Sequence, residues 1–493
     1  MELKIKLLKW SAGLPVVMLE KKTAEKIGVH AKDRVFIKTL SKPSKEISTI
    51  IDIVEGLIKE NDIAVSSELK KRLSLRVGQK VNVRIAQAPK SLISIKKKLN
   101  NKNLSEKEIN EIIQDVVNNS LSESEIALFI SAMYQQGTTM KETIYLIKAI
   151  LKSGNQLKLK SKFVFDKHSI GGIPGNRTTP IVVSICAEAG LILPKTSSRA
   201  ITSAAGTADV IETIANVEFS TNQVKNILKK TNACLIWGGS LGIVPADSKI
   251  IQIEKILKID PPAQLLASII SKKLAMNTQH ILIDIPYGKG AKVSRKEALN
   301  LERKFKYLGK YFKKEIKCVL TDGRQPIGNG IGPMLELIDV LKVLNLDKEA
   351  PKDLEKKSLF LSGKLLEMAK KAKKGEGFAL ARKILYSKKA LERFEKIIKA
   401  QKGNFKKLQL AKFKKIIKTN SSGKIKEISN KEISSLARVA GCPVDKSSGL
   451  YLHFHVGEKV KKKEKILTIY SNSKSRINEA IKFYNEKRPI KIK

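Results

Sequence analysis

The chain is poor in cysteine, the residue that cross-links small secreted domains and binds zinc. Its four cysteines, Cys186, Cys234, Cys318 and Cys442, are widely separated among 493 residues and form no Cys-x-x-Cys pair. This spacing indicates neither a disulfide framework nor a zinc site. We therefore expect no metal, and we expect the protein to work in a reducing cytoplasm.

Long apolar runs are absent as well. No uncharged apolar run approaches the length of about 18 residues that a membrane-spanning helix needs, and the N-terminus lacks the apolar core of a signal peptide. Aromatic residues make up only 5% of the chain, and they are not interleaved with a basic patch. These absences predict no membrane partner and no nucleic-acid partner.

Acidic residues are about half as frequent as basic ones. Lys and Arg number 95 against 47 Asp and Glu, which gives a formal net charge of +48. Such an excess bears on anionic partners rather than on the fold. Because the lysines are spread along the chain, we favour a general lysine bias, and a basic non-catalytic nucleic-acid-binding protein stays open as an alternative.

An internal repeat occupies the N-terminal region. The segments 17–40 and 63–86 can be aligned, and each reads as a strand, a short helix and an alternating strand. Residues 1–86 are therefore predicted to form a pseudo-symmetric β-barrel-like domain. It carries no candidate acid, base or phosphate loop, so we expect it to serve assembly rather than catalysis.

The periodicity changes after residue 87. Three capping boxes predict helix starts: Ser105-x-x-Glu108, Ser122-x-x-Glu125 and Thr139-x-x-Glu142. We predict a helical domain over 88–160 with a later segment near 245–275, an α/β phosphate-binding domain over 161–345, and a C-terminal α+β domain over 346–493. The fold class is therefore multidomain α/β with α+β.

Two segments of the predicted α/β domain suit anion binding. In 166–176 a strand ends in Lys167 and Ser169 before a Gly-rich turn and a helix, a pattern in which backbone N–H groups can close on an anion. In 197–209, hydroxyl, basic and glycine residues dominate. Each segment alone could equally be an ordinary solvated turn.

Two further segments carry candidate polar groups. Asp260 precedes two prolines and an otherwise apolar segment, which predicts a helix with Asp260 as N-cap and Pro261 as its first residue. Capping alone would explain this aspartate. The segment 284–292 again ends a strand in a Gly/Lys turn, and it contains Lys289 and Lys292.

In this order, the four segments resemble the thymidine/pyrimidine-nucleoside phosphorylase family. DKHSIGG is similar to that family's phosphate loop, and SSRAITSAAGTADVIE is similar to its signature. The segments 244–247 and 321–330 match further landmarks, and several long motifs in order are far more specific than one. The resemblance, over roughly 88–490, implies a helical domain facing an α/β domain across a cleft.

The departures from that family point to one of its branches. Where thymidine enzymes place a Tyr and an Arg that read the base, this chain has Ile250 and Ile253, and the signature histidine is replaced by Ser203. Lys289 and Lys292 add positive charge. The extra N-terminal barrel, the Pro-Gly-Asn of 174–176 after the Gly-rich loop and the SRAITS string of 198–203 look like the AMP phosphorylase branch. That branch converts a nucleoside 5′-monophosphate and phosphate into a free base and ribose 1,5-bisphosphate.

The resemblance implies a site without a covalent enzyme intermediate. Asp260 would donate a proton to the leaving base. Residues expected to bind the nucleotide are Gly172, Ser198, Arg199, Ala200, Ile201, Thr202, Ser203, Thr207, Ser268 and Lys292. Lys167, Ser169 and Ser197 are expected to bind inorganic phosphate, which is the co-substrate, and no other cofactor and no metal is expected.

Several alternatives stay open at this stage. The nucleotide could be AMP, CMP or UMP, and the same fold could serve a nucleoside phosphorylase or an anthranilate-type phosphoribosyltransferase. The latter normally needs magnesium-binding acidic residues, and no Asp-Asp or Asp-Glu pair stands at the expected loops. We expect a homo-oligomer, a dimer or larger.

Overall fold

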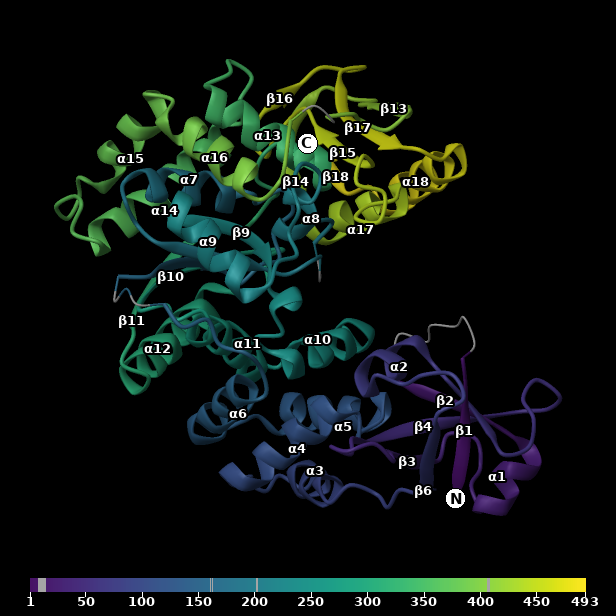
Figure 1. Cartoon of the computed structure of the whole chain (residues 1–493). Coiled ribbons are helices and arrows are strands. Elements are labelled where there is room, and N and C mark those ends of the chain that lie inside the picture. Colours follow the sequence, from purple (N-terminus) through teal and green to yellow (C-terminus); the bar gives the residue numbers. More distant parts are fainter. Residues whose placement is uncertain (8–14, 160, 162, 201–202, 406–407) are drawn as a thin grey trace. The chain divides into compact units, whose positions relative to one another are not determined.

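The computed structural model describes residues 1–7, 15–159, 161, 163–200, 203–405 and 408–493 (Figure 1). These residues form two compact units. The first unit is Met1–Gly154 with Pro245–Ser268, and the second is Asn155–Val244 with Ile269–Lys493. Within the described part of the chain, each helix is too short or too polar to cross a membrane.

The N-terminal strands of the first unit close into a barrel. Its elements are β1 (Glu2–Leu7), β2 (Val16–Glu20), α1 (Lys21–Ile27), β3 (Arg34–Thr39), β4 (Glu46–Val54), β5 (Asp62–Val65), α2 (Ser67–Leu73) and β6 (Lys80–Ile85). The strand order is β1-β5-β2-β4-β3-β6. The β2-α1-β3 and β5-α2-β6 segments are the two predicted halves, so the prediction of a pseudo-symmetric barrel is confirmed.

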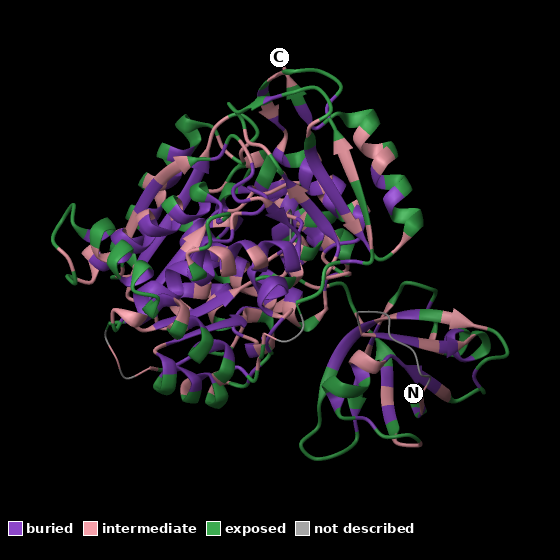
Figure 2. Cartoon of the chain, turned by 90° about the horizontal axis from the view of Figure 1, so that it is seen from above, coloured by how far each residue is buried: buried purple, intermediate pink, exposed green. Residues whose placement is uncertain are grey.

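The repeat pattern also gives the barrel its core. Val35 and Val81 are aligned in the two halves, as are Ile37 and Val83, and all four side chains are 0% exposed. Figure 2 shows the barrel strands banded between buried and less buried residues, as a strand with one face inward requires. Ion pairs such as Arg84–Glu46, at 2.8 Å, lie at the barrel surface.

Six helices follow in the first unit, the last of them continuing into the second. They are α3 (Ser91–Leu99), α4 (Glu106–Asn118), α5 (Glu123–Gln136), α6 (Met140–Lys152), α10 (Pro245–Leu257) and α11 (Pro262–Ala275). The three predicted capping boxes are formed at α4, α5 and α6.

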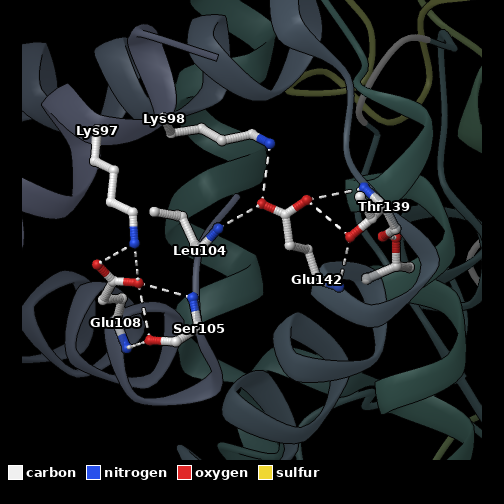
Figure 3. A network of polar contacts seen from close by, with 8 residues as sticks. Lys97, Lys98, Leu104, Ser105, Glu108, Thr139 and Glu142 are labelled. Atoms are coloured by element: carbon white, nitrogen blue, oxygen red, sulfur yellow. Dashed lines mark hydrogen bonds and ion pairs between the residues drawn. The ribbon is translucent and has the colours of Figure 1, made fainter. Parts of the chain in front are cut away.

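Two of these caps are joined to lysines of α3 (Figure 3). Glu142 accepts hydrogen bonds from the amide of Leu104 at 3.0 Å and from Lys98 Nζ at 2.9 Å. Lys98 and Glu142 are 3% and 2% exposed, so this ion pair lies inside the bundle. A cap and a buried salt bridge thus share one carboxylate, which fixes the start of α6 against α3.

The C-terminus of α4 is held by two cations from other elements. Lys249 of α10 donates to the carbonyls of Val116 and Val117 at 2.8 and 3.0 Å. Arg72 of α2 also donates to Val117 O, at 2.8 Å. Positive groups satisfy the last carbonyls of a helix and oppose its dipole, so these contacts tie the barrel and α10 to the same helix end.

The second unit is built on parallel strands. They are β7 (Phe165–Ser169), β8 (Leu193–Ser197), β9 (Ala233–Trp237), β10 (His280–Tyr287) and β11 (Glu315–Asp322). The order β11-β10-β7 continues through a parallel bridge between Val164 and Ile192 to β8-β9. The helical elements between and after them are α7 (Thr178–Glu188), α8 (Thr207–Ile211), α9 (Thr221–Thr231), η1 (Gly238–Leu241), α12 (Arg295–Tyr311), α13 (Pro333–Asn345), α14 (Lys352–Met368), α15 (Gly377–Tyr386) and α16 (Lys389–Ala400).

The C-terminal part of this unit is α+β, the predicted class, while α14, α15 and α16 of the predicted 346–493 segment share the core of the α/β strands. Its elements are β12 (Gly330–Ile331), β13 (Phe413–Lys418), β14 (Gly423–Ile428), α17 (Asn430–Ala440), β15 (Gly449–Leu452), β16 (Lys459–Val460), β17 (Lys465–Ser471), α18 (Lys474–Lys487) and β18 (Ile490–Ile492). The sheets have the orders β12-β15-β17-β13 and β16-β14-β18. In Figure 1, α17 and α18 lie beside β15 and β17.

All four cysteines of the chain lie in the second unit, and each is a buried free thiol. Burial raises the pKa of Cys186, Cys234 and Cys442 well above the ordinary value, and it raises the pKa of Cys318 to about 12. At neutral pH these side chains therefore behave as small apolar core residues.

Candidate functional site

The two predicted anion loops follow neighbouring parallel strands. β7 ends at Ser169 and β8 ends at Ser197, and the bridge between Val164 and Ile192 places the strands side by side. Ligands of parallel α/β sheets bind outside the carboxyl ends of the strands. The fold therefore brings both loops to the edge where an anion site is expected.

The Gly-rich loop after β7 depends on its glycines. Gly171 and Gly172 have φ values of 86° and 90°, which residues with a side chain rarely adopt. A Cβ added to Gly172 would lie 3.2 Å from Lys292 Cβ. The structure thus places Lys292 against the Gly-rich loop, and two predicted nucleotide-binding residues meet there.

Lys167 lies beneath this loop. It is 2% exposed, and its Nζ donates to Thr178 Oγ1, at the start of α7, at 2.8 Å. Burial lowers the pKa of Lys167 to about 8, although Asp284 opposes that change. A buried ammonium beside the positive end of a helix favours an anion nearby.

A second cluster of buried charges surrounds Asp166. Lys273 Nζ and Lys195 Nζ lie 2.5 and 3.2 Å from its carboxylate oxygens, and all three residues are at most 4% exposed. Burial would raise the pKa of Asp166, but the two lysines hold it below its usual range. Burial first, and then the surrounding lysines, lower the pKa of His168, so this imidazole is neutral at neutral pH.

The loop between β8 and α8 is closed by Asp209. One oxygen of its carboxylate accepts hydrogen bonds from the amides of Ala200 at 2.7 Å and Gly206 at 2.8 Å. A Cβ on Gly206 would lie 2.3 Å from Ser198 O, so the loop can close only over a glycine. Ile201 and Thr202, both predicted to bind the nucleotide, lie outside the described residues.

Arg199 is held within this loop by carboxylates. Its guanidinium pairs with both oxygens of Glu212, at 2.5 and 2.7 Å, and reaches Glu218 at 3.2 Å. Hydrogen bonding to Arg199 lowers the pKa of Glu212 to about 2. In this arrangement the Arg199 side chain holds the loop in place through these carboxylates.

Other predicted residues are bound within the protein. Ser197 Oγ donates to Ile236 O at 3.2 Å, and Ser203 Oγ donates to Ala205 O at 2.7 Å. Thr207 Oγ1 accepts from Arg177 Nη1 at 2.6 Å, and Arg177 also bonds Glu336. Sequence patterns did not indicate Arg177, since its partner Glu336 is 159 residues away.

Asp260 and Ser268 belong to the first unit, where both are half-buried. The helix α11 begins at Pro262, and the amide of Leu265 donates to Pro261 O at 3.0 Å. The capping position is therefore Pro261, one residue later than predicted, because the chain turns into the helix after the first proline. Asp260 precedes the cap, and Ser268 lies two turns into the helix.

Two isoleucines of α10 stand where thymidine enzymes have the base-reading Tyr and Arg, and both point into the core of the first unit. Ile250 and Ile253 of α10 are 0% and 5% exposed. Gln264 of α11 is also buried, and it donates to Asp247 of α10 at 3.0 Å. Among the described residues, no three His, Cys, Asp or Glu side chains are grouped as metal ligands.

Family models match three successive parts of the chain. Residues 94–154 match the helical bundle domain of a glycosyl transferase family, and residues 161–390 match the a/b domain of that family. Residues 424–491 match the pyrimidine nucleoside phosphorylase C-terminal domain.

Curated relatives match over nearly the whole length. The AMP phosphorylase of Methanococcus aeolicus is 40% identical over 99% of this chain and 97% of its own. That of Pyrococcus abyssi is 42% identical over 100% of this chain and 98% of its own. The solved anthranilate phosphoribosyltransferase of Thermus thermophilus shares the fold, with a TM-score of 0.53 and 17% identity over 63% of this chain and 99% of that one.

Proposed function

Since the chain belongs to the AMP phosphorylase family and is a pentosyl-transferring phosphorylase, we propose that it acts on AMP, and on CMP and UMP where the base fits. Inorganic phosphate is the co-substrate. The products are a free base and ribose 1,5-bisphosphate.

In the proposed reaction, an oxygen of inorganic phosphate attacks C1′ while the bond from C1′ to the base nitrogen breaks. The electrons of that bond pass to the base, which takes a proton from Asp260. The new C1′–O bond leaves the ribose phosphorylated at C1′ as well as at C5′. No side chain forms a bond to the sugar, so positioning and proton transfer supply the rate.

The contact between Gly172 and Lys292 carries the nucleotide part of the proposal. It puts an exposed lysine directly against a loop whose backbone can approach an anion closely. Gly172, Lys292, Thr207, Ser268 and the residues 198–203 are proposed to bind the nucleotide. Lys167, Ser169 and Ser197 are proposed to bind inorganic phosphate, and no metal or other cofactor takes part.

A phosphate-dependent release of base tests this function. The protein is incubated with AMP, CMP or UMP, with and without inorganic phosphate, and free base is measured by chromatography. We expect base only when phosphate is present. Equal release in phosphate-free buffer would identify a hydrolase instead.

The 5′-phosphate requirement has its own test. A charge-assisted hydrogen bond contributes about 1.5–3 kcal/mol, so kcat/KM should be at least about tenfold higher for AMP than for adenosine. Equal values for the two substrates would favour a nucleoside phosphorylase on the same fold.

A further inference from the structure

Helix α17 of the C-terminal part contacts the turn that carries Lys292. Its first residue, Asn430, is 2% exposed. Asn430 Nδ2 donates to the carbonyl of Gly290 at 3.1 Å and to the carbonyl of Gly323 at 2.8 Å. One buried amide therefore joins the Lys292 turn to the end of β11.

The Lys292 turn is closed by its own backbone, with hydrogen bonds from Gly288 N to Val293 O at 3.1 Å and from Ala291 N to Gly288 O at 3.0 Å. Gly288 and Gly290 have φ values of 127° and 79° and no side chains to pack. Lys289 pairs with Glu427 of β14 at 3.2 Å, but Lys289 is itself exposed, and exposed ion pairs stabilise little. The buried contacts of Asn430 are therefore the main restraint from the C-terminal part.

The same helix also holds the loop that contains Ser203. Arg438 Nη2, two turns further along α17, donates to Ser203 O at 3.1 Å. The next residue of the loop, Ala204, is 0% exposed and packs in the C-terminal core with Ile433 and Ala437 of α17. Both a polar and an apolar contact thus fix this loop to α17.

We propose that α17 sets the spacing between the two nucleotide-binding loops, with Asn430 and Arg438 as positioning residues. The two residues are eight positions apart, about 12 Å along a helix that rises 1.5 Å per residue. A helix hardly changes length, so its two ends hold the Lys292 turn and the Ser203 loop at a fixed separation. The inference rests on the proposed function, because it takes both loops as part of the AMP site.

The substitution Asn430→Asp tests the first contact. An aspartate suits the first turn of a helix, so α17 should remain folded while two carbonyls face a carboxylate instead of an amide. Titration calorimetry without phosphate should show about tenfold weaker binding of AMP, and less than about threefold weaker binding of adenosine. The matched control is Asn222→Asp, at an exposed position in the first turn of α9, which should change neither affinity.

The substitution Arg438→Met tests the second contact through an exposed side chain, so folding should not depend on it. It keeps the apolar stem, removes the donor to Ser203 O, and should weaken AMP binding about three- to tenfold. If neither variant weakens AMP binding relative to adenosine by more than the control does, α17 has no positioning role. Because binding is measured without turnover, this test does not depend on the release of base. A failure to release base would overturn the proposed function but would not decide whether α17 positions the loops.

Discussion

The ion pairs within the N-terminal barrel lie at its surface, whereas the parallel sheet of the second unit also holds ion pairs in its interior. The Arg84–Glu46 pair leaves 58% and 35% of its side chains exposed. The Lys273–Asp166 pair leaves 1% and 0% exposed. Burying charges costs free energy unless they are paired, so a region that keeps them is under a constraint other than folding.

The two regions therefore divide the work of the protein. Among its described residues the barrel buries no charged side chain. The sequence offers no candidate acid, base or phosphate loop there, and a structural role accounts for it. The sheet buries lysines near the ends of β7 and β8, where the predicted phosphate loops begin. Four predictions test this division, from the largest expected effect to the smallest.

The largest effect is expected at Asp260, outside both regions. Asn has nearly the same size and shape as Asp, but its amide cannot deliver a proton. Asp260→Asn should therefore lower kcat by about 10²–10⁴-fold with little change in the melting temperature. If the variant kept more than about a third of the wild-type kcat, Asp260 would be structural and the acid would lie elsewhere.

The next effect compares the two kinds of ion pair directly. Asp166→Asn leaves Lys195 and Lys273 without their shared counter-charge, which should lower the free energy of unfolding by about 3–5 kcal/mol at pH 7. Glu46→Gln in the barrel should cost about 0–1 kcal/mol. Both are measured by urea unfolding. Similar losses of unfolding free energy in the two variants would contradict the distinction between the surface pairs of the barrel and the buried pairs of the sheet.

The pH dependence of kcat/KM for phosphate should report the titration of Lys167. Burial lowers its pKa to about 8, so its ammonium loses the proton as the pH rises through that value. Since kcat/KM reports groups of the free enzyme, the value for phosphate should fall about tenfold per pH unit above this pKa. Lys167→Met should have low activity without that alkaline fall. A fall that persists in the variant would assign the titration to another group.

The smallest catalytic effect is expected from the barrel. Deleting residues 1–86 removes the contacts of Arg34 and Arg72 with the helices but no proposed site residue. We expect kcat to change by less than about threefold, while the number of subunits in the assembly in solution falls. A folded variant that keeps the same number of subunits would contradict the assembly role.

Local patterns in the sequence predicted much of the fold. The repeat predicted the barrel because its alternation encodes which face is inward, as Val35 and Val81 show. The capping boxes predicted helix starts because both partners are three residues apart. At Asp260 the pattern predicted a helix that starts at Pro261, whereas the helix starts at Pro262.

The site was harder to derive because many of its contacts span the chain. The pairing of Arg177 with Glu336 and of Arg438 with Ser203 joins residues 159 and 235 positions apart. No local spacing encodes such contacts. The same limit applies to the ion pairs of Arg199 with Glu212 and Glu218, which lie 13 and 19 positions away.

The placement of the cysteines makes the two units separately observable. The first unit contains none of the four thiols, and the second buries all of them. Because the thiolate is the form that reacts, a thiol-specific label will modify the protein only when the second unit opens. The labelling rate in increasing denaturant therefore measures the opening of the second unit alone, and a cysteine introduced into the barrel would report the first unit in the same experiment.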